Sequence, residues 1–181
     1  MPKKNDTRER VLKTAAALFR TQGYHATGLN QVLAEGGAPK GSLYFHFPGG
    51  KEQLAVESLR LSGGELSERF RQTQSLDEVL ELLGKRLVES DFREGCPIAT
   101  VALDAAADSE QIRQACDGAY AGWERVIADS LAEQGIKNAE ALATTVLAAI
   151  EGALLLARTR KDLAPLRQVG HHLKLLIEKE R

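Results

Sequence analysis

The chain has 181 residues, of which 27% are charged and 43% hydrophobic, and its formal net charge is −1. This composition is typical of a folded globular protein and excludes a disordered tail. Two cysteines, Cys96 and Cys116, are too few for a disulfide framework and favour a reducing compartment. The N-terminus lacks an apolar secretion signal, and the longest apolar stretch, residues 141–157, is too short to span a bilayer. We therefore expect a cytoplasmic protein with no membrane partner.

Charge is distributed unevenly along the chain. Residues 1–60 hold nine Lys or Arg against five Asp or Glu, a net charge of +4, whereas residues 61–181 hold fifteen against twenty, a net charge of −5. Five of the nine aromatic residues also lie in the first sixty positions. This asymmetry predicts a small basic N-terminal part that meets a polyanion and an acidic remainder with a different task.

Helical periodicity runs through the first fifty residues. The first helix follows an N-cap at Asp6 or Thr7 and ends at Gly23. The hydroxyl of Thr27 caps a second, short helix that ends at a pair of glycines, and a third short helix covers residues 40–46. Two short helices joined by a tight glycine turn and preceded by a longer helix are the signature of a helix-turn-helix.

Longer helices follow, and no run shows the alternation of a half-buried strand. We expect them at about residues 51–73, 76–91, 97–107, 109–134, 138–160 and 163–179. The helix over residues 51–73 links the two parts of the chain. The sequence therefore predicts an all-α fold, with a helix-turn-helix domain over residues 1–50 and a second helical domain over residues 51–181.

Side chains suited to DNA gather in and around the third helix. Hydroxyl, phenol, imidazole and ammonium groups bind phosphate oxygens, and a glycine lets the backbone approach a base edge. We expect contacts with double-stranded DNA from Thr27, Lys40, Gly41, Ser42, Tyr44, His46 and Lys51. Phe45 and Phe47 are expected in the core, since a duplex offers no exposed base faces. Lys3 and Lys4 would add an N-terminal arm.

Residues 7–59 contain the runs Thr-Arg-Glu-Arg-Val-Leu, Gly-Gly-Ala-Pro-Lys-Gly-Ser-Leu-Tyr-Phe-His-Phe and Lys-Glu-Gln-Leu. These runs resemble the N-terminal domain of the TetR family of transcriptional repressors. The resemblance implies an all-helical homodimer with a DNA-binding domain over residues 1–50 and an effector-binding and dimerisation domain over residues 51–181. It also marks the same seven positions as facing DNA. Two features depart from the family pattern: Pro39 stands where many relatives have a serine cap, and residues 48–50 lengthen the usual linker by one residue.

Residues 95–106, with the Pro-Gly-Gly-Lys run, resemble a subgroup that includes drug-resistance and flavonoid-responsive repressors. A cavity between helices, lined by apolar groups and a few polar ones, is the usual site of a small molecule. Candidate effector-binding residues are Cys96, Thr100, Asp104, Tyr120, Trp123 and Ile127. Ordinary core packing remains the alternative for the aromatic residues among them. For Glu151, a salt bridge or the edge of the solvent is favoured over a pocket carboxylate.

Cys96 precedes Pro97 at an expected helix start, where a helix dipole would favour the thiolate. This placement, and a Gly-Cys segment similar to that of an electrophile-sensing repressor, make a thiol sensor conceivable. The alternative is a small buried residue at a tight turn, which is a common fate of free cysteine. Cys116 is expected in the core.

Small residues near the C-terminus allow helices to approach closely. A symmetric four-helix dimer interface is expected from the helices over residues 138–160 and 163–179. The residues assigned to it are Ala149, Gly152, Ala153, Val169, Leu173 and Leu176. Contacts within one chain are the alternative, and both are expected to contribute.

The function that these patterns favour is a ligand-responsive transcriptional repressor, which a small and largely apolar effector releases from a palindromic operator. The alternative within the same architecture is an electrophile or oxidant sensor that acts through Cys96. A helical enzyme or a nonspecific architectural DNA binder is disfavoured, because no catalytic constellation occurs and residues 61–181 are acidic. We expect no cofactor and no metal site, since the adjacent His171 and His172 diverge on a helix.

Overall fold

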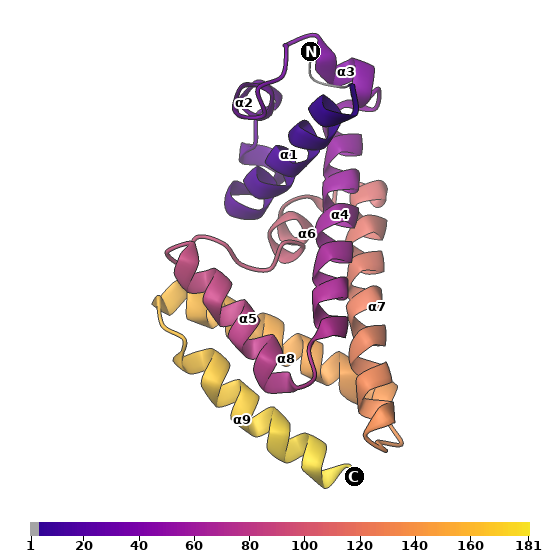
Figure 1. Ribbon diagram of the computed structural model, residues 1–181, viewed down its shortest axis with the longest axis vertical. Coiled ribbons are helices and arrows are strands. Elements are labelled where there is room, and N and C mark those ends of the chain that lie inside the picture. Colours follow the sequence, from indigo (N-terminus) through magenta and orange to yellow (C-terminus); the bar gives the residue numbers. More distant parts are fainter. Residues whose placement is uncertain (1–3) are drawn as a thin grey trace. The chain divides into compact units, whose positions relative to one another are not determined.

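The computed structural model describes residues 4–181, with side chains from Asp6 onward, and within this range its regular elements are nine α-helices (Figure 1). In chain order they are α1 (Lys4–Ala26), α2 (Leu29–Glu35), α3 (Ser42–His46), α4 (Gly50–Gln72), α5 (Leu76–Glu89), α6 (Ala99–Ala105), α7 (Glu110–Glu133), α8 (Ala139–Arg160) and α9 (Ala164–Lys179). The all-α prediction is confirmed. From α4 onward the boundaries differ from the predicted ones by at most two residues. The predicted arm of Lys3 and Lys4 lies outside the described side chains.

The helices form two compact units, neither of which is contiguous in sequence. Unit 1 contains Met1–Gly63 and Pro97–Ala119, and unit 2 contains Gly64–Cys96 and Tyr120–Arg181. Both α4 and α7 continue from one unit into the other without a break. The helix-turn-helix therefore shares its compact unit with α6 and the first part of α7, whereas the sequence divides the chain at residue 50. The functional division at that residue stays a prediction.

Unit 1 is built around α1, which packs against α2 and α6 (Figure 1). The side chains of Val11, Ala15 and Phe19 are at most 2% exposed and recur every four residues, so they form one apolar face of the helix. The helical path breaks at Gly23, where φ is 85° and ψ is 176°, a region that is essentially reserved for glycine. The predicted end at Gly23 is thus a break inside α1, which continues to Ala26.

Two predicted N-caps are wrong. Since α1 already begins at Lys4, Asp6 lies in its first turn, where its carboxylate accepts a hydrogen bond from Arg10 at 2.8 Å. A negative charge in the first turn and an ion pair four residues apart both stabilise a helix without capping it. At α2 the N-cap residue is Gly28 and no side chain caps the helix. Thr27 instead donates its hydroxyl proton to the carbonyl oxygen of Gly23 at 2.6 Å.

Unit 2 has α8 at its centre, packed on α9, while α9 also packs on α5 (Figure 1). Nine residues of α8 are buried, including Val146, Ile150 and Leu154. Among the described helices, α8 is the one that is long and apolar enough to cross a membrane, so the expectation that this stretch is too short is wrong. Its buried face is what the central helix of a globular unit requires.

Candidate nucleic-acid interface

The short helix α3 is fixed to unit 1 by one apolar face. Leu43 and Phe47 lie four positions apart, so they point the same way, and their side chains are 2% and 0% exposed. Tyr44 points away from this face and is 65% exposed. The opposite surface of α3 is therefore presented to solvent, as the predicted DNA contact at Tyr44 requires.

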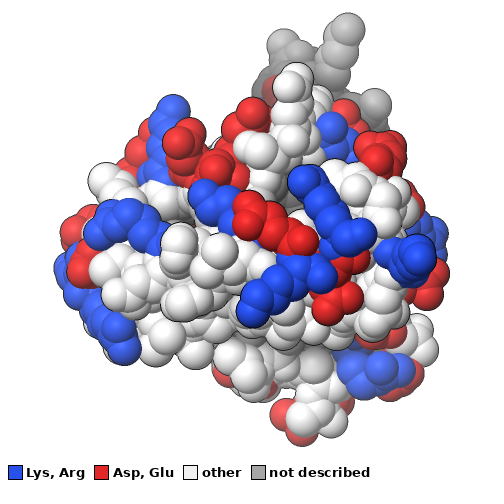
Figure 2. Space-filling model, turned by 90° about the horizontal axis from the view of Figure 1, so that it is seen from below, with Lys and Arg blue, Asp and Glu red and all other residues white. Residues whose placement is uncertain are grey.

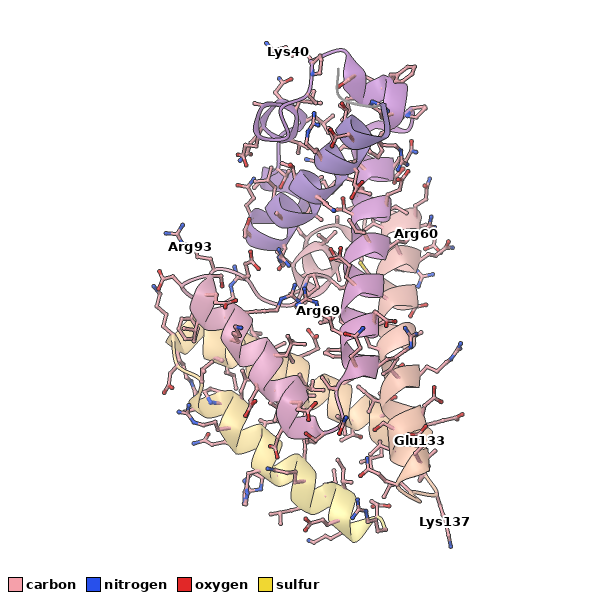
Figure 3. The ribbon with its side chains drawn as sticks, viewed as in Figure 1. Lys40, Arg60, Arg69, Arg93, Glu133 and Lys137 are labelled. Atoms are coloured by element: carbon pink, nitrogen blue, oxygen red, sulfur yellow. The ribbon has the colours of Figure 1, made fainter. Side chains whose placement is uncertain are left out.

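The turn before α3 is also exposed. The helix begins at Ser42, two residues later than predicted, because the carbonyl oxygen of Pro39 accepts hydrogen bonds from both the amide and the hydroxyl of Ser42, at 2.9 and 2.7 Å. Lys40 and Gly41 thus lie in the turn, and the Lys40 side chain projects outward between α2 and α3 (Figure 3). A Cβ built at Gly41 would meet no atom within 4 Å, so the backbone there is open to a close approach.

Phe45 is not a core residue, contrary to the prediction. Its side chain is 59% exposed, while Phe47 is fully buried as predicted. On an α-helix, position 45 lies about 200° around the axis from position 43, so both cannot face the core. The Phe45 ring packs edge-on against His46, with 5.0 Å between ring centroids, and His46 is half-buried. The exposed surface of α3 therefore carries two aromatic rings, where the sequence predicts one.

Thr27 differs from the other predicted contacts. Its side chain is 1% exposed, and its hydroxyl proton is held by the Gly23 carbonyl. The structure thus uses this hydroxyl to close the turn after α1, and it does not present it to solvent.

Lys51 lies in the first turn of α4 and is folded back onto the end of α1. Its ammonium group is 4.6 Å from the centroid of the Tyr24 ring and donates a hydrogen bond to the His25 carbonyl oxygen at 3.4 Å. Burial lowers the pKa of Lys51, an effect that the nearby charge of Asp104 opposes. Burial also raises the pKa of the Tyr24 phenol, and the charge of Glu52 adds to this shift. Lys51 is therefore a partly desolvated cation with a defined position.

Several basic groups of α1 are engaged within the protein. Arg10 pairs with Asp6 at 2.8 Å and Lys13 pairs with Glu9 at 2.6 Å, in both cases across one turn of the helix. Such exposed pairs contribute at most about 1 kcal/mol each, so they add modestly to the stability of α1. They also reduce the positive charge that α1 presents. The basic groups next to α3 therefore account for more of the attraction to a polyanion.

The predicted effector residues do not form one group. Thr100 and Asp104 lie on α6 in unit 1, and the Asp104 carboxylate accepts a hydrogen bond from the backbone N–H of His25 at 2.7 Å. Placing Asp104 in an effector site is thus not supported, because this carboxylate holds the end of α1. The spacing of Thr100 and Asp104 on one helical face was visible in the sequence, but their tertiary partner was not.

The remaining effector candidates belong to unit 2. Trp123 is 1% exposed and packs edge-on against Phe70 and Tyr120, with ring centroids 6.1 and 5.5 Å apart. Tyr120 and Ile127 are half-buried. These contacts give Trp123 a packing role and leave Tyr120 and Ile127 as the more accessible candidates.

Cys96 and Glu151 contact each other in unit 2. Burial raises the pKa of the Glu151 carboxyl, while a hydrogen bond from the Cys96 side chain lowers it. Cys96 is 6% exposed and lies three residues before α6 begins, so it is not in the first turn of that helix. Reactive cysteines occupy electropositive and partly exposed places. The Cys96 thiol is instead buried and hydrogen-bonded to a carboxyl group, so its surroundings do not favour a role as a thiol sensor. Glu151 is half-buried, which agrees with the expected place at the edge of the solvent, and the partner of its carboxyl group is the Cys96 thiol.

The six predicted dimer residues separate into two sets. Ala153 and Leu173 are 1% and 4% exposed within the single chain, which favours for these two residues the intrachain contact that is the stated alternative. Gly152 is exposed, and the remaining three, Ala149, Val169 and Leu176, are half-buried. The larger exposed apolar side chains of these helices are Leu155, Leu156 and Leu175.

Comparisons with known proteins agree on one family. Residues 11–57 match the family described as "Bacterial regulatory proteins, tetR family", and residues 73–172 match "Transcriptional regulator LmrA/YxaF-like, C-terminal domain". The chain is 38% identical to the uncharacterized HTH-type transcriptional regulator YxaF of Bacillus subtilis, over 99% of this chain and all of that one. It is also 38% identical to the HTH-type transcriptional regulator LmrA of the same organism, over 91% of this chain and 93% of the relative.

A solved structure gives the same result. The fold resembles the crystal structure of a TetR transcriptional regulator from Chloroflexus aurantiacus, with a TM-score of 0.80, 29% identity, and coverage of 99% of this chain and 98% of that chain. The exposed face of α3, the helix-turn-helix around it and these matches lead to one assignment. The chain belongs to the TetR family of bacterial transcriptional regulators, and its C-terminal part is of the LmrA/YxaF-like type.

Proposed function

We propose that this regulator is a ligand-responsive repressor. It binds a palindromic operator as a homodimer, with one α3 in each of two successive major grooves, and a small, largely apolar effector releases it. The observation that carries the proposal is the exposed surface of α3, where Tyr44 and Phe45 stand next to Lys40 and Gly41 over a buried apolar base. An element of this width fits the major groove, and its groups suit phosphates and base edges.

The proposed DNA contacts are those of α3 and its flanking turns. Lys40, Gly41, Ser42, Tyr44 and His46 come from one short segment, to which Lys51 adds a cation at the start of α4. Thr27 is left out because its hydroxyl is buried and bonded within the chain. The face of the molecule in Figure 2 differs in character, since basic and acidic side chains there lie next to one another, as on an ordinary solvated surface.

The test of DNA binding begins with in vitro selection from a duplex library randomised over about 24 base pairs, enough for two half-sites one helical turn apart. The recovered duplex should be palindromic. Lys40→Ala and Tyr44→Ala should each weaken binding by about tenfold or more, because each removes a phosphate or base contact. Lys85→Ala removes an exposed lysine of α5 and is the matched control. Equal affinities of all four proteins would contradict the assignment, and recovery of no sequence would contradict specific binding altogether.

The homodimer is proposed from the family and from the exposed Leu155, Leu156 and Leu175 of α8 and α9. Sedimentation of the full chain should give twice the chain mass of 19.7 kDa. The DNA-binding variants should sediment in the same way, because their substitutions lie in unit 1. A monomer at micromolar concentration would refute this part of the proposal.

Effector binding is assigned to unit 2, where the single tryptophan of the chain offers a specific signal. We expect an effector to change the fluorescence of Trp123 and to release the selected duplex in the same concentration range. A ligand shifts the balance between the DNA-binding and the released conformation only when its affinities for the two conformations differ. A panel of flavonoids and other planar apolar compounds is the probe. Cys96→Ser should respond like the unmodified protein. Loss of the response in that variant would favour the thiol sensor instead.

A further inference from the structure

The end of α1 is held by a carboxylate from a distant part of the sequence. The Asp104 side chain of α6 accepts a hydrogen bond from the backbone N–H of His25 at 2.7 Å, across 79 positions. A Cβ added at Gly23 would lie 2.9 Å from the same carboxylate oxygen, so the chain can approach this closely because residue 23 is a glycine. The contact is therefore built into the backbone conformation after α1, and it is not a chance meeting of two surface groups.

The other side of the same residue holds Lys51. The carbonyl oxygen of His25 accepts a hydrogen bond from the Lys51 ammonium at 3.4 Å, and that ammonium lies 4.6 Å from the centre of the Tyr24 ring. The backbone of His25 thus connects Asp104 on α6 with Lys51 on α4. The negative charge of Asp104 also favours the charged form of Lys51, against the effect of burial.

We propose that Asp104 is a positioning residue for Lys51: by fixing the His25 backbone, it holds the Lys51 ammonium where it meets a DNA phosphate. The inference rests on the proposed DNA-binding function. A free lysine side chain samples many rotamers, and ordering one at an interface costs conformational entropy. A lysine that is held before binding avoids most of this cost, which gives Asp104 an effect on DNA affinity without contact with DNA.

Three variants test the route through the backbone, each measured with the duplex recovered by in vitro selection. Asp104→Ala removes the acceptor, and we expect binding to weaken about three- to tenfold, the size typical of side chains that share a network. Asp104→Asn keeps an oxygen acceptor for the His25 amide, so its DNA affinity should stay within twofold of that of the unmodified protein. Asp77→Ala removes a carboxylate from α5 in unit 2 and controls for the change in net charge.

The decisive measurement is a double-mutant cycle with Lys51→Ala. If Asp104 acts through Lys51, Asp104→Ala has no further effect once Lys51 is absent. Lys51→Ala should also reduce the slope of log affinity against log salt by about one phosphate contact, whereas Asp104→Ala, which keeps the lysine cation, should not. A loss caused only by weaker folding would add to that of Lys51→Ala.

Two results would overturn the inference: additive losses in the cycle, or an Asp104→Asn variant that binds as weakly as Asp104→Ala. Circular dichroism and sedimentation of each variant establish that it is folded and assembled. Failure of the unmodified protein to select any duplex would instead refute the proposed function, so the two failures are distinguishable.

Discussion

Replacing Gly23 by alanine tests how the end of α1 is built. With φ at 85° and ψ at 176°, this residue occupies a region that alanine enters at a cost of about 1–3 kcal/mol. The new Cβ would also lie 2.9 Å from the Asp104 carboxylate, which must move and release the His25 amide. A hydrogen bond to a charged group contributes about 1.5–3 kcal/mol, so we expect a total loss of roughly 2–4 kcal/mol in unfolding free energy when part of the strain relaxes.

Gly135→Ala is the matched control for this substitution. Gly135 also has a positive φ, of 87°, but a Cβ there would meet no atom within 4 Å. It should therefore show backbone strain alone, about 1–2 kcal/mol. Urea unfolding gives the free energies, and hydrogen–deuterium exchange locates the damage. Faster exchange in residues 19–28 is expected for Gly23→Ala and not for Gly135→Ala.

The reasoning fails if the two variants lose equal stability and residues 19–28 exchange as slowly in Gly23→Ala as in the unmodified chain. That outcome would mean that the Asp104 contact contributes nothing to the end of α1. It would also remove the basis for a connection between α6 and Lys51.

Three further substitutions or reactions have defined outcomes. Burial raises the pKa of Glu151, so the folded chain keeps the carboxyl proton to higher pH than the unfolded chain. The stability that the protonated carboxyl group contributes is complete below the unfolded pKa of about 4.5 and is lost as pH rises through the folded pKa. Urea unfolding should therefore show Glu151→Gln to be more stable than the unmodified protein at pH 7 but not at pH 4. Burial raises the pKa of Cys116 to about 11, so iodoacetamide at pH 8 should modify this thiol far more slowly in the folded than in the urea-unfolded chain, and equal rates would contradict its burial. Phe45 offers DNA an exposed apolar ring, and the C5-methyl of thymine is the apolar group of the major groove. Replacing thymine by uracil at one position per half-site of the selected duplex should therefore weaken binding of the unmodified protein about threefold or more and leave binding of Phe45→Ala unchanged.

Much of the fold follows from local signals in the sequence. Glycine and proline mark the helix ends, and the four-residue recurrence of Val11, Ala15 and Phe19 identifies the buried face of α1. Such signals depend on a few neighbouring residues, so they survive without knowledge of the tertiary structure. The outward direction of Tyr44 on α3 follows from the same periodicity.

What the sequence does not predict depends on partners far along the chain. Asp104 has the residue type expected of a polar group in a pocket, and only the fold shows that its partner is the His25 amide. Thr27 has the residue type of an N-cap, but a carbonyl oxygen at Gly23 offers its hydroxyl a buried partner. The difference at Phe45 has another cause: the absence of exposed base faces in a duplex does not by itself place a phenylalanine in the core, because an apolar ring can also lie at the surface. Its direction relative to Leu43 was available from periodicity alone.

The discontinuity of unit 1 has a consequence for synthesis of the protein. Residues up to 63 leave the ribosome before Pro97–Ala119, the segment that completes the same unit and supplies the α6 partner of α1. A nascent chain that ends after α4 thus lacks the α6 packing partner of α1, although it already contains the α2 partner. By the same reasoning, a gene truncated at residue 63 is a poor source of an isolated DNA-binding fragment, whereas one that joins residues 1–63 to 97–119 through a short linker keeps the native set of neighbours.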